Sequence, residues 1–166
     1  MNWFKGWKLM IDAFNIFLQT NPETTLYFIG DGEDRNKINN YIIELKLSKH
    51  IKLIGFQSLD TISDYLNMAD LFIMGSYKEG WSTSLVEAVS CGAPCVVTDF
   101  SSASDMVQNG INGYVVSERD ESLFAEKMNN ALSLIDENLI QAAQNIQCLS
   151  VNNMRKEFEK FLLNNT

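Results

Sequence analysis

The stretch Asp70–Phe100, DLFIMGSYKEGWSTSLVEAVSCGAPCVVTDF, decides the fold. It opens with DLFIMGS and closes with PCVVTDF, two short apolar runs that are typical of buried strands. The residues between them predict a loop followed by a helix. The unit therefore predicts two strands with a helix between them.

The same alternation continues in both directions. Strands are predicted in TTLYFIGDG (24–32), HIKLIGF (50–56) and NGINGYVV (109–116). Helices are predicted where apolar residues recur at helical spacing: Met10, Ile11, Phe14, Phe17 and Leu18; Ile38, Tyr41, Ile42 and Leu45; Ile62, Tyr65, Leu66 and Ala69; Phe124, Met128, Ala131 and Ile135; and Met154, Phe158, Phe161 and Leu162. Near-continuous apolar strands separated by helices predict an α/β fold, a Rossmann-like three-layer α/β/α domain with a parallel sheet.

Length and composition predict one domain over residues 1–166, with C-terminal helices in 136–166. The 166 residues are 46% hydrophobic, which suits one globular core. No apolar run approaches the ~20 residues that a membrane span needs, and the start, MNWFKGWKLM, lacks a secretory cleavage site. We therefore expect a cytoplasmic protein.

The charge and the cysteines exclude two classes of site. A net charge of −8 argues against nucleic-acid partners, which need a basic surface, but leaves a small anionic ligand open. Cys91, Cys95 and Cys148, with the single His50, have no zinc-ligand spacing. We expect no bound metal.

Candidate ligand-binding residues follow the predicted strands. In open parallel sheets the ligand crevice lies beyond the carboxyl ends of the strands. The glycine-containing turn at 30–32, the pair Gly55 and Phe56, and the pair Glu79 and Gly80 all lie at such ends. The short GDG at 30–32 is by itself more typical of a simple turn than of a phosphate loop.

The segment after Glu79 predicts an anion site. Ser82, Thr83 and Ser84 are all good N-cap residues, so a helix that begins here presents free N–H groups and hydroxyls to the crevice. A helix N-terminus favours a diphosphate over a neutral ligand. Glu79 would then face hydroxyl groups, because a carboxylate repels phosphate.

Glu87 lies about one helical turn beyond Ser84. A carboxylate there can accept hydrogen bonds from two ribose hydroxyls, as in dinucleotide-binding folds. The alternative is an ordinary solvated helix glutamate, and the residue alone does not decide between them.

The set of motifs resembles a known family. EGWSTSLVEAVSCGAPCVVT is similar to the glutamate-x7-glutamate signature of retaining glycosyltransferases of family 4, which have the two-domain GT-B fold. KGWKLMIDAF, LYFIGDG, IKLIGF, ADLFIMGS and NGINGYVV match the donor-binding domain of that family in the same order, from Lys5 to Ile135.

The resemblance implies a role for each matching position. Glu79, the implied catalytic residue, would contact the transferred sugar together with Gly80, Trp81 and Ser82. The diphosphate would be bound by Lys5, Thr83 and Ser84, the ribose by Glu87, and the base by Gly55 and Phe56. The family needs no metal and no cofactor, and its donor would be a UDP- or GDP-sugar. The activity implied is that of a hexosyltransferase in polysaccharide or glycoconjugate assembly.

Two departures from the family bear on activity. The family has a strand ending in Gly-Arg shortly before the lysine, whereas this chain opens with MNWFKG. The segment SSASDMV has Asp105 where the family has a glutamate. We expect a fragment that lacks the first strand and the N-terminal acceptor domain and is inactive alone. The glycan or lipid-linked acceptor would bind that other domain, and a peripheral membrane contact of the longer protein stays open.

Two alternative functions remain from the sequence. The chain can be the donor half of a sugar-nucleotide epimerase of related architecture. It can also be a non-enzymatic interaction module, in which Trp3, Phe4, Trp7 and the C-terminal helices form a docking surface. Binding of a nucleoside diphosphate separates this module from the two enzymes.

Overall fold

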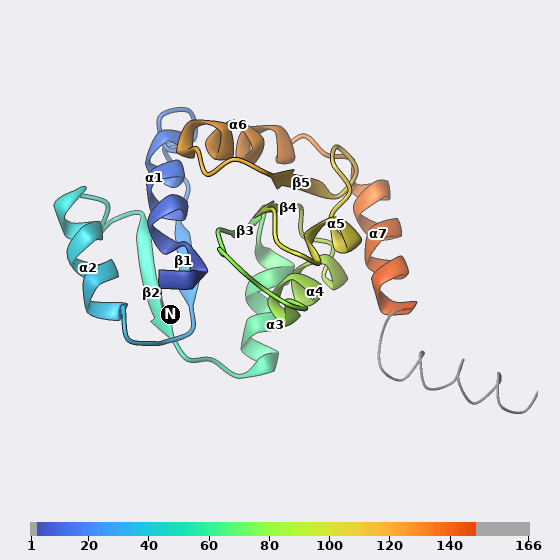
Figure 1. Ribbon diagram of the computed structural model, residues 1–166, viewed down its shortest axis with the longest axis horizontal. Helices are drawn as coiled ribbons and strands as arrows, with labels where there is room; N and C mark the ends of the chain where they lie inside the picture. Colours follow the sequence, from blue (N-terminus) through green and yellow to red (C-terminus); the bar gives the residue numbers. More distant parts are fainter. Residues whose placement is uncertain (1–2, 149–166) are drawn as a thin grey trace, which may run out of the picture.

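A computed structural model gives the structure of the protein and describes residues 3–148. Strands and helices alternate, as predicted (Figure 1). In chain order the elements are η1 Trp3–Lys5, α1 Trp7–Phe17, β1 Leu26–Ile29, α2 Arg35–Glu44, β2 Ile51–Gly55, α3 Leu59–Met68, β3 Phe72–Met74, α4 Thr83–Ser90, β4 Cys95–Thr98, α5 Ala103–Met106, β5 Gly113–Val116, α6 Glu121–Ala131 and α7 Asp136–Cys148.

The strands are parallel and form two separate ladders within the described residues. β1 pairs with β2, and β4 pairs with β3 on one side and β5 on the other. β1 and β3 each have a strand neighbour on only one edge. The predicted parallel arrangement is therefore confirmed, but the sheet is divided between β1 and β3.

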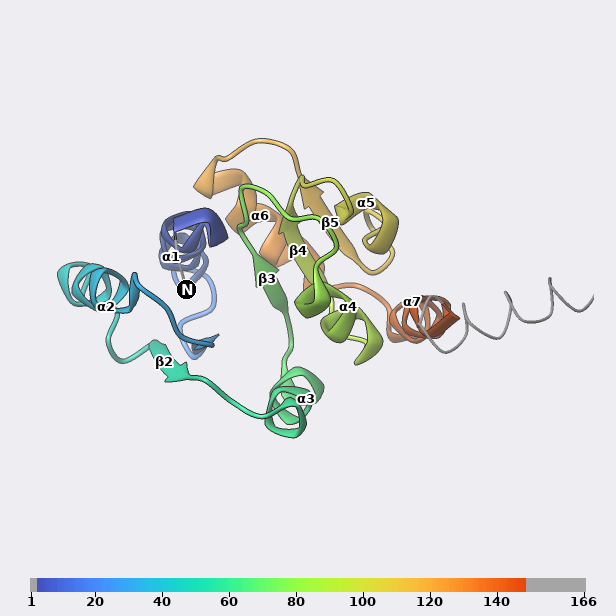
Figure 2. The same ribbon diagram turned by 60° about the horizontal axis from the view of Figure 1, so that its bottom comes forward.

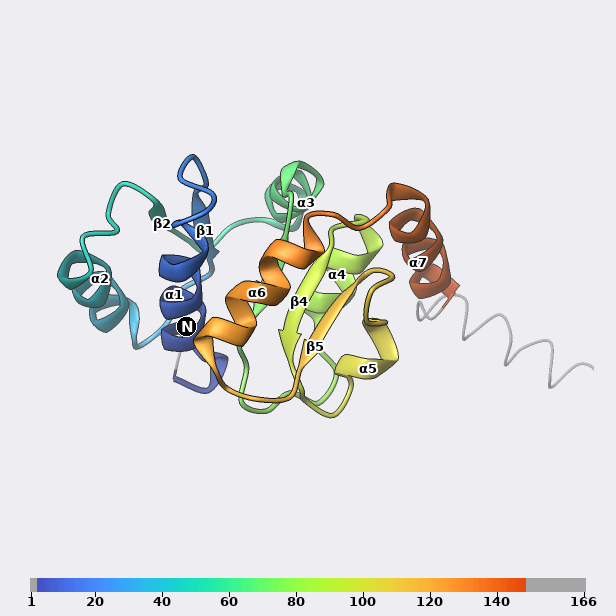
Figure 3. The same cartoon turned by 90° about the horizontal axis from the view of Figure 1, so that it is seen from above.

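Helices cover both faces, which gives the predicted three layers. α1 and α6 pack together on one face, and α3 and α4 lie on the other, with α7 against α4 (Figures 2 and 3). The central strand β4 contributes to both cores. Val96 packs with residues of α1 and α6, whereas Cys95 and Val97 pack with residues of α4.

Most of the predicted helix faces are buried as expected. In α1 the buried residues are Met10, Ile11, Ala13, Phe14 and Phe17, and the helix ends before the Asn21–Pro22 pair. α6 buries Phe124, Met128 and Ala131. Ile135 was predicted on the same face and is 63% exposed, because the helix ends at Ala131. That part of the prediction is wrong.

The strand predicted in DLFIMGS is less buried than its apolar sequence suggests. Phe72 and Ile73 are half-buried, and only Met74 is buried. The reason is that β3 has β4 on one edge and no strand on the other. The apolar face predicted at Met154, Phe158, Phe161 and Leu162 lies outside the described residues, as do the side chains of Trp3 and Cys148.

Candidate functional site

The carboxyl ends of the two ladders meet at the start of α1. Gly6, the N-cap of α1, has a φ of 61° and approaches the end of β3 so closely that a Cβ on it would lie 1.8 Å from the carbonyl oxygen of Gly75. The indole N–H of Trp7 donates to Asp34, which precedes α2 and follows β1, at 3.3 Å. These contacts bring the loops after β1 and β3 to one side of the molecule, as the sequence predicted.

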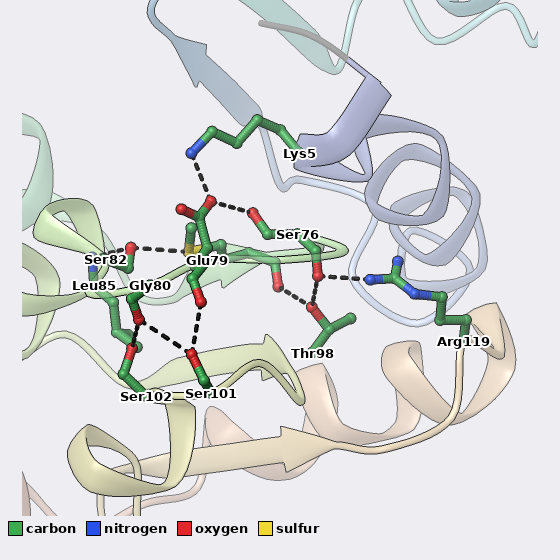
Figure 4. A network of polar contacts seen from close by, with 11 residues as sticks. Lys5, Ser76, Glu79, Gly80, Ser82, Leu85, Thr98, Ser101, Ser102 and Arg119 are labelled. Atoms are coloured by element: carbon green, nitrogen blue, oxygen red, sulfur yellow. Dashed lines mark hydrogen bonds and ion pairs between the residues drawn. The ribbon is translucent and has the colours of Figure 1, made fainter.

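Glu79 lies in the β3–α4 loop, where it makes two polar contacts (Figure 4). Its carboxylate accepts from the Lys5 ammonium at 2.6 Å and from the Ser76 hydroxyl at 2.8 Å. The Glu79 side chain is 15% exposed and that of Lys5 is 49% exposed. The structure thus brings together two predicted site residues that are 74 positions apart.

Helix α4 begins where the sequence predicted. Ser82 is its N-cap, and the hydroxyl of this buried residue accepts from the N–H of Leu85 at 3.3 Å. Thr83 and Ser84 follow it and are exposed. Their N–H groups have no hydrogen-bond partner among the described residues. Such N–H groups at a helix N-terminus are able to bind an anion.

Glu87 is half-buried in the second turn of α4, and no polar partner contacts its carboxylate among the described residues. Burial raises the pKa of this carboxyl above its ordinary value. A partly desolvated carboxylate without a cation has unused capacity to accept hydrogen bonds, which a ligand with vicinal hydroxyls can satisfy.

Two serines that the sequence analysis did not single out hold the backbone of the loop. The hydroxyl of Ser101 donates to the carbonyl of Glu79 at 2.8 Å, and that of Ser102 donates to the carbonyl of Gly80 at 2.6 Å (Figure 4). Both belong to the SSASDMV segment in which the sequence departs from its family pattern. Trp81, the next residue of the loop, is 54% exposed.

Gly55 and Phe56 lie in the other ladder, at the end of β2. The carbonyl of Gly55 accepts from the N–H of Gly30 at 2.7 Å, which links the ends of β1 and β2. Phe56 is 86% exposed, so its ring is available to a flat ligand group. A surface hollow beside β2, lined in part by Arg35, Asn39 and Lys52, lies in this half of the molecule and not at the Glu79 loop.

In residues 3–148 no three His, Cys, Asp or Glu side chains gather in a group that would hold a metal ion. No helix in this described range is long and apolar enough to cross a membrane. His50 contacts the main chain of Thr24 at 3.2 Å, at the start of the β1–β2 ladder.

The comparisons with known proteins identify the family. The sequence profile of the family described as "Glycosyl transferases group 1" matches residues 1–146. The chain belongs to this family. It is 30% identical over 133 residues to the lipopolysaccharide 1,6-galactosyltransferase of Salmonella typhimurium, covering 78% of the chain and 37% of that protein. It is 35% identical over 109 residues to the poly(glycerol-phosphate) alpha-glucosyltransferase of Bacillus subtilis, covering 65% and 16%.

A solved structure shows the same fold. The Anabaena protein Alr3699/HepE, in complex with UDP-glucose, superposes with a TM-score of 0.79 over 99% of this chain and 46% of that one, at 24% identity. The chain thus spans less than half the length of each of these proteins. The predicted family and Rossmann-like α/β fold, one half of a GT-B fold, are confirmed.

Proposed function

We propose that the chain is the donor-binding domain of a retaining glycosyltransferase and binds a nucleoside-diphosphate sugar at the start of α4. One observation carries the proposal: the N–H groups of Thr83 and Ser84, which have no hydrogen-bond partner within residues 3–148, lie in the chain between two carboxylates, Glu79 before the helix and Glu87 within it. This order matches a ligand with a central diphosphate and a hydroxylated ring on each side.

The contacts support a role for each group. The amides and hydroxyls of Thr83 and Ser84 bind the diphosphate, and Glu87 accepts from the ribose hydroxyls. Glu79 binds hydroxyls of the transferred sugar, with the backbone of Gly80, Trp81 and Ser82 beside that ring. Gly55 and the exposed Phe56 contact the base.

Lys5 changes partner when the donor binds. Without a ligand its ammonium neutralises Glu79 at 2.6 Å. A diphosphate at the start of α4 carries more negative charge than one carboxylate and so competes for the same ammonium. The lysine then stabilises the leaving diphosphate, and Glu79 keeps the Ser76 hydroxyl as a partner while it accepts from the sugar.

The relatives favour uridine nucleotides as donors. The Anabaena structure contains UDP-glucose, and a pneumococcal O-GlcNAc transferase with a TM-score of 0.82 was solved with UDP and GlcNAc. We therefore take UDP-glucose as the first test ligand. The acceptor would be a glycan or glycoconjugate that binds a second domain of a longer protein, and sugar transfer would need both.

The divided sheet supports the same view of a longer protein. Among residues 3–148, β1 and β3 each pair with a strand on one edge only. In the doubly-wound strand order 3-2-1-4-5-6 the first strand lies between the second and the fourth. We propose that a further parallel strand from outside residues 3–148 lies between β1 and β3.

The test is calorimetric titration of the chain with UDP and UDP-glucose. Thr83→Ala and Glu87→Ala each weaken UDP binding by ~1 to 3 kcal/mol if their groups bind the ligand. Thr61→Ala and Glu121→Ala are matched controls, because they alter the first turns of α3 and α6. Glu79→Gln does not weaken UDP binding, because it leaves Lys5 free for the diphosphate, and it impairs sugar transfer by the longer enzyme. Unchanged UDP binding by both alanine variants would contradict the assigned roles.

A further inference from the structure

Arg119 contacts the end of β3 from a distant part of the chain. It lies between β5 and α6, and its guanidinium donates to the carbonyl of Gly75 at 3.0 Å. It also donates to the carbonyl of Ser76 at 2.6 Å (Figure 4). The same guanidinium lies 3.4 Å from the centre of the Tyr77 ring. One side chain therefore contacts three consecutive residues at the start of the β3–α4 loop.

These three residues connect directly to the candidate site. The Ser76 hydroxyl donates to the Glu79 carboxylate, and Ser76 is completely buried. The Tyr77 N–H donates to the carbonyl of Phe4 at 2.7 Å, next to Lys5. The segment thus contacts the Glu79 carboxylate directly, through the Ser76 side chain, and reaches the chain before Lys5 only through its main chain.

Loss of Arg119 would loosen this segment without releasing it completely. The Ser76 carbonyl also accepts from the Thr98 hydroxyl at 2.6 Å, and Gly75 stays packed against Gly6. Arg119 is exposed, so its removal leaves no large cavity. The two hydrogen bonds that its guanidinium donates go to main-chain carbonyls, which indicates a role in geometry rather than in ligand contact.

We propose that Arg119 is a positioning residue that, through Ser76, orients the Glu79 carboxylate toward the sugar of the donor. The inference rests on the proposed function and adds a residue to it. Arg119 acts on the part of the site that binds the sugar, and the amides of Thr83 and Ser84 lie beyond Glu79 in the chain. Its removal therefore affects the sugar more than the nucleotide.

The test compares UDP with UDP-glucose in calorimetric titrations of the native chain and of Arg119→Gln. We expect UDP affinity to stay within twofold and UDP-glucose affinity to fall about fivefold, the size of one net hydrogen bond. Arg119→Lys, which keeps the charge but not the planar fork, should recover part of the loss. Lys127→Gln is the matched control, because it removes a cation near the Tyr114 ring, outside the Glu79 loop.

A double-mutant cycle separates positioning from a general effect on stability. If Arg119 acts through Glu79, Arg119→Gln causes no further loss of UDP-glucose affinity in a Glu79→Gln background. Equal losses for UDP and UDP-glucose, or additive losses in the double variant, would overturn the inference and leave the proposed function intact. A native chain that binds neither ligand would instead overturn the proposed function.

Discussion

The two ladders differ in both burial and loop structure. All four residues of β4 are buried, whereas β1 buries only Phe28 and leaves Tyr27 47% exposed. The loop after β3 is held by side-chain bonds from Lys5, Ser101, Ser102 and Arg119. In the other ladder, the loop after β2 exposes Phe56 almost completely.

If the proposed function holds, the difference indicates which part of the proposed site is fixed before a ligand arrives. Groups that bind sugar and diphosphate gain most from preorganisation, because these contacts depend on the direction of hydrogen bonds. A flat base can be bound by an exposed ring with less demand on direction. The β3–β5 half therefore provides the rigid part of the site, and the β1–β2 half provides an open surface.

The largest expected effect comes from breaking the contact that joins the halves. Gly6→Ala places a Cβ 1.8 Å from the carbonyl oxygen of Gly75 at a φ of 61°. We expect a loss of about 3 to 5 kcal/mol in the free energy of unfolding, since backbone must move to relieve the clash. Urea unfolding measures it. Gly110→Ala is the control: its φ is 76° but nothing lies near its Cβ position, so about 1 kcal/mol is expected.

The difference in burial predicts that a substitution in β4 lowers the free energy of unfolding more than one in β1, by a smaller amount than the Gly6 effect. Val96→Ala in β4 removes methyl groups from a fully buried site and should lower the free energy of unfolding by about 2 kcal/mol. Tyr27→Ala in β1 removes a half-exposed ring whose aromatic neighbour is Tyr65 and should cost less than about 1 kcal/mol. Equal losses in thermal or urea unfolding would contradict the comparison.

The smallest expected effect is on the pH dependence of ligand binding. The pKa of Glu87 is raised by burial, so the carboxylate becomes protonated, and a weaker acceptor for ribose hydroxyls, at higher pH than an exposed glutamate. UDP-glucose affinity should fall as pH decreases through that raised pKa. UDP ends in a phosphate monoester that itself titrates near pH 6. UDP-glucose has no such terminal group, so it is the better probe of Glu87.

Glu87→Gln should remove this pH dependence of UDP-glucose affinity. If the affinity of the variant still falls in the same pH range, another group is responsible.

The folding stability of the unliganded protein should depend on pH in the opposite direction. The folded state binds the Glu87 proton more tightly than the unfolded state, so stability is highest below the unfolded pKa and falls as pH rises through the folded one.

Local patterns in the sequence predicted the elements and the start of α4. Periodic apolar residues marked α1 and α6, and the Ser82–Ser84 run marked the helix N-terminus, because these signals depend on neighbouring residues. The exposure of Ile135 was missed because no Gly or Pro marks the end of α6. No local pattern predicted the divided sheet, since strand pairing depends on distant segments; only the family resemblance indicated a missing strand.

The polar contacts around Glu79 also could not be predicted from local sequence patterns. Arg119 reaches Ser76 across 43 positions, and no local pattern encodes such a contact. One signal was present: Arg119 follows β5, and residues after parallel strands gather at the carboxyl edge. The pairing of Lys5 with Glu79 was also unforeseen, although the family resemblance had placed both residues in the site.

The most direct test of the central claim is an amide NMR titration of the ¹⁵N-labelled chain with UDP-glucose. If the start of α4 binds the diphosphate, the amide proton signals of Thr83 and Ser84 shift most strongly, because their N–H groups gain acceptors. Unmoved signals at these two residues, with the main shifts beside the hollow at Asn39 and Leu53, would contradict the account.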